Sequence, residues 1–96
     1  MKDLIKTLTE AYGPSGDEGQ VRALIEDAVR GVVTEMRTDP LGNLIALKRG
    51  SGGGKRVMIA AHMDEIGLVV THIDKKGFLR VGRVGGVMPP TLMGGR

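Results

Sequence analysis

Residues 57–67 read Val-Met-Ile-Ala-Ala-His-Met-Asp-Glu-Ile-Gly, and the predicted fold class follows mainly from them. Its first half, residues 57–61, is a continuous apolar run, whereas a strand with one solvated face alternates apolar and polar residues. The run therefore predicts a strand buried on both faces inside an α/β sheet. In open sheets of this kind, ligands bind beyond the carboxyl ends of the strands, which is where His62 follows.

His62 and Asp64 are the residues of this stretch that can carry chemistry. Side chains two positions apart on an extended segment point to the same side, so both are expected to face one cleft. A neutral imidazole is a good ligand for zinc or cobalt, and a nearby carboxylate can fix its tautomer and orientation. The pair is therefore a candidate metal half-site. The alternative interpretation is that His62 caps a strand and Asp64 begins a turn.

Two other polar residues near the pair are expected to stay outside the site. Glu65 is adjacent to Asp64 on an extended segment and should point to the opposite face, at the surface or behind the ligands. His72 lies beyond a turn on a different strand, where a lone histidine is usually structural or exposed.

Upstream of this stretch the sequence predicts two helices. Apolar residues recur on one face over residues 3–12, and Gly13-Pro14 ends that helix. Ser15 and Glu18 have the spacing of a capping box, which predicts that Ser15 caps a second helix. An apolar stripe then continues to about Gly31.

Short extended segments make up the rest of the chain. Residues 32–38 and 43–48 are expected to pair around a turn at 39–42, and residues 66–73 and 78–84 around a turn at 74–77. The glycine-rich residues 50–54 should form a flexible loop tip. A further strand is expected to begin at residues 94–96.

Composition narrows the class of protein. A chain of 96 residues forms one domain at most, and its net charge of +3 comes from scattered residues. Tyr12 and Phe78 are the only aromatic residues, too few for base stacking, so no nucleic-acid partner is expected. Without cysteine, a metal must be held by histidine and carboxylate. No signal peptide or membrane-spanning run is visible, and we expect a cytoplasmic protein without a membrane partner.

Other catalytic motifs are absent from the sequence. The stretch Gly50 to Arg56 lacks the spacing and the hydroxyl of a phosphate-binding loop, and its lysine precedes a strand rather than opening a helix. No H-E-x-x-H motif and no G-x-S-x-G elbow is present. Nucleotide binding, one-metal zincin chemistry and serine hydrolysis are therefore not expected.

Several motifs, in order, resemble one known family. Residues 61–67, 70–74 and 77–80, with the upstream segments Gly-Pro-Ser-Gly (13–16) and Asp-Pro-Leu-Gly-Asn (39–43), are similar to the tetrahedral and glutamyl aminopeptidases, metallopeptidase family forty-two. The likeness spans nearly the whole chain. It departs at Val87 and Met88, where members of that family commonly have a tryptophan and an acidic residue.

The resemblance implies a two-metal exopeptidase that removes N-terminal residues from peptides. His62 would bind one of two divalent metal ions, zinc or cobalt, and Asp64 would be the catalytic carboxylate that orients the cluster. The other ligands and a glutamate base lie downstream in that family, outside this chain. The resemblance also implies homo-oligomers: dimers, which assemble into a hollow tetrahedral dodecamer.

The fold class implied is the N-terminal part of a co-catalytic zinc-peptidase-like α/β domain, with two helices plus sheet strands. Residues 1–67 would belong to that catalytic domain. Residues 68–96 would begin an inserted β-rich dimerisation domain. The piece alone would be incomplete and inactive.

Two other functions remain as alternatives. The first is a short degenerate family member that acts as a non-catalytic interaction module through open strand edges, which favour pairing with another chain. The second is a glycoside hydrolase, which ranks last because sugar sites favour aromatic platforms and a pair of catalytic carboxylates.

Overall fold

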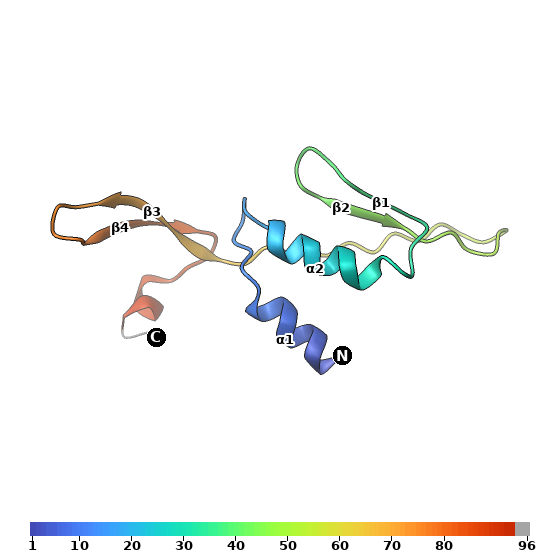
Figure 1. Cartoon of the computed structure of the whole chain (residues 1–96), viewed down its shortest axis with the longest axis horizontal. Helices are drawn as coiled ribbons and strands as arrows, with labels where there is room; N and C mark the ends of the chain where they lie inside the picture. Colours follow the sequence, from blue (N-terminus) through green and yellow to red (C-terminus); the bar gives the residue numbers. More distant parts are fainter. Residues whose placement is uncertain (94–96) are drawn as a thin grey trace.

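The computed structural model describes residues 1–93 (Figure 1). In chain order its elements are helix α1 (Lys2–Glu10), helix α2 (Gly19–Val29), strands β1 (Glu35–Thr38), β2 (Leu44–Leu47), β3 (Gly67–Ile73) and β4 (Leu79–Val84), and the 3₁₀ helix η1 (Pro89–Leu92). β1 pairs with β2 and β3 with β4, each antiparallel, so the described residues form two separate two-stranded sheets. The α/β class is confirmed, and the strand expected at residues 94–96 lies outside the described residues.

Both helices follow their apolar stripes, but the predicted capping box is wrong. Glu18 itself occupies the N-cap position of α2, and no side chain caps that end of the helix. The Glu18 carboxylate instead accepts a hydrogen bond from the Gly16 N–H at 2.5 Å. A tight turn, closed by the Asp17 N–H donating to the Pro14 carbonyl at 2.9 Å, keeps Ser15 away from the helix. Its hydroxyl is therefore available for another partner.

The first hairpin, β1–β2, is confirmed with a register that pairs Glu35 with Leu47 and Thr38 with Leu44. Its turn is fixed by Asp39, whose carboxylate accepts hydrogen bonds from the N–H groups of Leu41 and Asn43, each at 2.9 Å. A further bond from the Asn43 side chain is the main reason that the pKa of Asp39 lies below its ordinary value.

The second hairpin, β3–β4, is also confirmed, with Gly67 opposite Val84 and Ile73 opposite Leu79. The Asp74 carboxylate accepts from the N–H groups of Lys76 and Phe78 at 2.8 and 2.9 Å, and this organises the turn. Figure 1 shows this hairpin projecting away from the two helices. It therefore forms a unit of its own at one end of the described chain.

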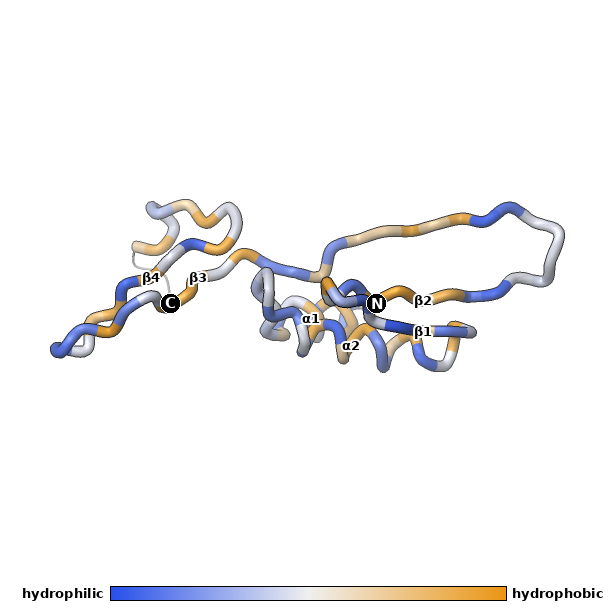
Figure 2. The backbone as a smooth tube through the Cα atoms, turned by 90° about the horizontal axis from the view of Figure 1, so that it is seen from above, coloured by the Kyte–Doolittle hydropathy of each residue, from blue (hydrophilic) through white to orange (hydrophobic). Residues whose placement is uncertain are grey.

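The buried strand predicted over residues 57–61 is wrong for the described residues. This segment has no ladder partner and no strand assignment there, and it follows an elongated course back from the glycine-rich loop (Figures 1 and 2). Val57 and Ile59 are 83% and 93% exposed. A buried strand needs neighbouring strands and covering helices. No described strand pairs with residues 57–61, and no described helix buries them.

Little of the described chain is buried. Its radius of gyration is 18.1 Å, against about 13 Å for a compact chain of this length. Val21 and Val87 are the only buried hydrophobic residues among those described. Apolar side chains on both hairpins and on residues 57–59 are exposed instead. The described chain is therefore an elongated α/β assembly without a common core, and the expected central sheet is not formed within residues 1–93.

Candidate metal half-site

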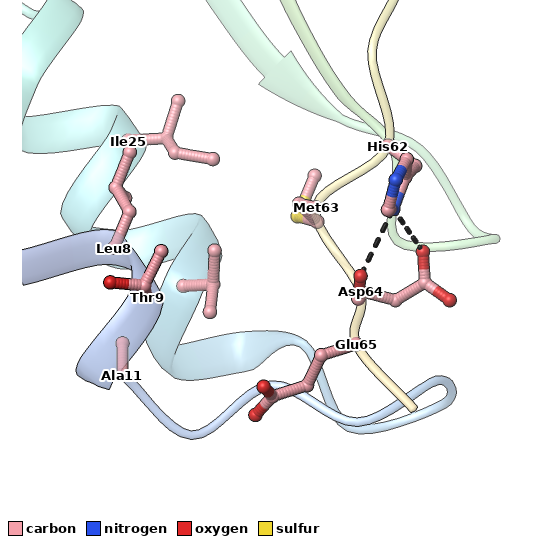
Figure 3. A pocket seen from close by; sticks show the side chains of 9 residues that line it. Leu8, Thr9, Ala11, Ile25, His62, Met63, Asp64 and Glu65 are labelled. Carbon is pink, nitrogen blue, oxygen red and sulfur yellow. Dashed lines mark hydrogen bonds and ion pairs between the residues drawn. The ribbon is translucent and has the colours of Figure 1, made fainter. Parts of the chain in front are cut away.

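His62 and Asp64 meet in the structure. The imidazole Nδ1 lies 2.9 Å from Asp64 Oδ1 and 3.0 Å from the backbone carbonyl oxygen of the same residue. Figure 3 shows both side chains on one side of the chain, with Met63 and Glu65 on the other. The alternation expected of an extended segment therefore holds for residues 62–65, although the preceding strand is not formed.

The partners of Nδ1 fix the tautomer of His62. A carbonyl oxygen and a carboxylate oxygen both accept hydrogen bonds, so Nδ1 must carry the proton and donate. The lone pair of the neutral ring then sits on Nε2, the nitrogen on the far side. An imidazole held this way is ready to bind a metal through Nε2.

Ser15 is a member of the site that the sequence prediction missed. Its hydroxyl donates a hydrogen bond to Asp64 Oδ2, the carboxylate oxygen that His62 does not use. These hydrogen bonds, that from Ser15 first and that from His62 second, hold the pKa of Asp64 below its ordinary value, because they stabilise the ionised carboxylate. The sequence offers one signal for this contact, the Gly-Pro-Ser-Gly segment that carries part of the family resemblance, but the spacing of Ser15 and Glu18 predicts a helix cap instead.

Backbone hydrogen bonds join the segment of Ser15 to that of Asp64. The Glu65 N–H donates to the Gly13 carbonyl at 2.9 Å, and the Ser15 N–H donates to the Glu65 carbonyl at 3.3 Å. Pro14 and Glu65 thereby form an isolated parallel bridge. Two segments that lie about fifty residues apart in the chain are thus fixed side by side at the candidate site.

Gly13 allows the segment of Ser15 to lie beside that of Asp64, because α2 packs directly against position 13 and leaves no room for a side chain. A Cβ atom at position 13 would approach Val21 Cγ2 to 2.5 Å and Val21 Cβ to 3.3 Å. Gly13 is buried, and Val21 is only 6% exposed. A β-branched side chain in such a position has little freedom to move aside.

We expect Gly13→Ala to destabilise the intact protein by about 1–3 kcal/mol, the usual range for an overpacked site. Chemical denaturation would measure the change. Gly31→Ala is the matched control, because nothing lies within 4 Å of the Cβ that it adds. Equal stability of the two variants would show that the contact between Gly13 and α2 is not formed.

A pocket of about 280 Å³ lies between the helices and the segment that carries the pair (Figure 3). Leu8, Thr9, Ala11, Val21 and Ile25 line its helical side, and residues 62–65 line the other. In Figure 3 Met63 and Glu65 point toward the helices, whereas the imidazole and the Asp64 carboxylate point away from them. The imidazole and the carboxylate are therefore on the side of the segment turned away from the helices.

The described residues do not complete a metal site. No group of three or more histidine, cysteine, aspartate or glutamate side chains that could enclose an ion occurs within residues 1–93. The His62 side chain is 84% exposed, and that of Asp64 is 38% exposed. His72 lies on β3, opposite Arg80, and Glu65 faces away from the pair. These described residues therefore bring together one exposed imidazole and one carboxylate hydrogen-bonded to it.

The shape of the chain is shared with known aminopeptidases. A solved aminopeptidase of the archaeon Desulfurococcus kamchatkensis matches 94% of this chain and 25% of its own, with a TM-score of 0.88 and 46% identity. A solved structure from Thermotoga maritima, described as an endoglucanase, matches 92% of this chain and 28% of its own, with a TM-score of 0.85 and 49% identity. The fold is thus that of the N-terminal part of an aminopeptidase-type α/β protein.

Sequence comparison gives the family. The family model described as M42 glutamyl aminopeptidase matches residues 42–96. A lysyl aminopeptidase of Pyrococcus furiosus is 49% identical over 95% of this chain and 26% of its own length. The chain belongs to the M42 glutamyl aminopeptidase family, and the predicted resemblance is confirmed. That family is one of metallopeptidases, and it implies a divalent metal cofactor.

The chain spans about a quarter of the length of the curated relatives that it matches. Among its described residues, no helix has the length and apolar character that crossing a bilayer requires.

Proposed function

We propose that this chain is the N-terminal portion of a two-metal aminopeptidase that hydrolyses N-terminal residues from peptides. The observation that carries the proposal is the contact between His62 Nδ1 and Asp64 Oδ1 at 2.9 Å, because it leaves Nε2 as the free ligand atom. His62 is the proposed metal ligand and Asp64 the proposed catalytic carboxylate that orients it. Family membership and the names of the relatives support the choice of reaction.

The donor set fits the proposed metals. Imidazole and carboxylate suit zinc and cobalt, and the family implies a divalent ion. A pair of such ions, when bound, polarises the scissile carbonyl and lowers the pKa of a bound water. Within this chain Asp64 would keep the proton on Nδ1 and restrict the orientation of the ring, so that Nε2 could serve as a ligand atom. The remaining ligands and the general base would come from segments outside this chain.

The proposal includes an arrangement of domains. Residues 1–67 would belong to the catalytic domain, and residues 68–96 would begin an inserted β-rich domain used for dimer contacts. The exposed apolar side chains on β3 and β4, among them Leu68, Val70 and Leu79, support this because they need a covering surface. The intact protein would be a cytoplasmic homo-oligomer, a dimer or a tetrahedral dodecamer, that acts on peptides.

Two alternatives are separated from this proposal by experiment. The exposed edges of both hairpins also suit a degenerate member that only binds another chain. The similarity to the Thermotoga maritima protein described as an endoglucanase raises polysaccharide hydrolysis. The first alternative predicts a purified protein without hydrolase activity, and the second predicts one that cleaves polysaccharides.

The direct test is cleavage of aminoacyl chromogenic substrates by the intact protein before and after chelation. We expect cleavage to be lost on treatment with a chelator and restored by zinc or cobalt, because the nucleophile depends on the ions. The same samples are assayed on soluble cellulose derivatives. Cellulose hydrolysis without peptide cleavage would favour the endoglucanase, and a metal-independent oligomer without either activity would favour the interaction module.

A further inference from the structure

The Asp64 carboxylate has one donor on each oxygen. His62 Nδ1 lies at Oδ1, and the Ser15 hydroxyl donates to Oδ2. The first donor comes from the same short segment as Asp64, whereas the second comes from the far side of the parallel bridge at Pro14 and Glu65. The two contacts are therefore independent in origin, and only the first could be expected from the His-x-Asp spacing.

The Ser15 contact has a rigid support. The backbone of Ser15 donates to Glu65, and Glu65 donates to Gly13, which is packed against Val21 of α2. The Asp17 N–H donates to the Pro14 carbonyl and closes the following turn. The backbone on both sides of Ser15 is thus held in place. Its hydroxyl reaches Asp64 from a fixed position rather than from a free loop.

A second donor changes what the carboxylate can do. The terminal torsion of an aspartate is broad, so a carboxylate with one partner can rotate and exchange its oxygens. A fixed donor on Oδ2 restricts that rotation and keeps Oδ1 on the imidazole. Partners that orient a metal-binding histidine commonly change metal affinity or rate by about 10 to 100-fold.

From this geometry we propose that Ser15 is a positioning residue of the metal half-site. It holds the plane of the Asp64 carboxylate, and through it the ring of His62, so that Nε2 keeps one direction. The proposal rests on the proposed metal-binding role of His62. Ser15 is proposed to act through Asp64, and neither as a metal ligand nor as a substrate-binding residue.

The test compares Ser15→Ala and Ser15→Thr in the intact protein, with zinc affinity measured by competition against a chelator and cleavage measured separately. We expect Ser15→Ala to weaken zinc binding and lower kcat by about 10-fold, with KM nearly unchanged, since the substrate is not contacted. Ser15→Thr keeps the hydroxyl and should restore most of both values. Ser51→Ala, in the exposed glycine-rich loop, is the matched control and should resemble the parent protein.

A second comparison distinguishes a role of Ser15 in positioning Asp64 from a purely structural role in joining two segments of the chain. If Ser15 acts through Asp64, Ser15→Ala should have less than about a twofold effect when added to Asp64→Asn, because residues that act as a unit are not additive. An undiminished effect in that background would overturn the proposal, as would parental zinc affinity in Ser15→Ala. A parent protein that binds zinc without cleaving peptides would contradict the proposed function, yet the affinity measurements would still decide the role of Ser15.

Discussion

Replacing His62 with alanine is expected to abolish peptide cleavage by the intact protein and to leave one metal position empty. The imidazole is the sole histidine at the half-site, and its Nε2 is the proposed ligand atom. Loss of a supporting partner alone commonly lowers metal affinity or activity by about 10 to 100-fold. Loss of the ligand itself should therefore lower the cleavage rate by more than about 100-fold. Metal content by elemental analysis and cleavage rate measured on the same preparation would check this.

The second histidine of the chain provides the control. His72 lies on β3 opposite Arg80, and a His72→Ala variant should keep its metal content and its rate within about twofold. The His62 side chain is 84% exposed and bonds only to Asp64 among the described residues, so its removal should not unfold the chain. Parental turnover and metal content in His62→Ala would refute the assignment.

Asp64→Asn is expected to keep more metal than His62→Ala but to lose about 10 to 100-fold in rate. The amide has the shape of the carboxylate, yet it carries no charge and offers one acceptor oxygen in place of two. That oxygen cannot serve both the His62 Nδ1–H and the Ser15 hydroxyl in the arrangement that the structure shows. The imidazole is therefore held less firmly.

Asp27→Asn is a suitable control for this prediction. Asp27 lies on α2, its side chain is 76% exposed, and its partner is Arg30 at 3.2 Å. An exposed pair of this kind contributes little to stability, so neither rate nor metal content should change. A similar loss in both aspartate variants would point to a general effect of charge, and the positioning role of Asp64 would then be wrong.

Local patterns predicted most of the secondary structure. Both helices and both hairpins occur near their expected positions, because apolar periodicity and turn residues act over a few neighbouring positions. Asp39 and Asp74 show why the turns were predictable: each carboxylate accepts N–H groups two and four residues ahead of it. The boundary between a catalytic and an inserted domain near residue 67 stays a prediction.

Two expectations failed for a common reason. The strand predicted over residues 57–61 requires partners that the described residues do not supply. The capping box predicted at Ser15 is not formed. A turn at Pro14 forms instead, and the Ser15 hydroxyl donates to the distant Asp64 carboxylate. A pattern of residue types gives the capacity to make a contact, but the choice among possible partners depends on the rest of the fold.

The helices, the hairpins and the pairing of His62 with Asp64 follow from the local sequence. Those features depend on residues close together in the chain, whose relative positions follow from backbone geometry alone. The contact of Ser15 with Asp64 and the packing of Gly13 against α2 arise only in the folded chain. Contacts between residues about fifty positions apart depend on how distant segments pack together, and local periodicity in the sequence does not predict that packing.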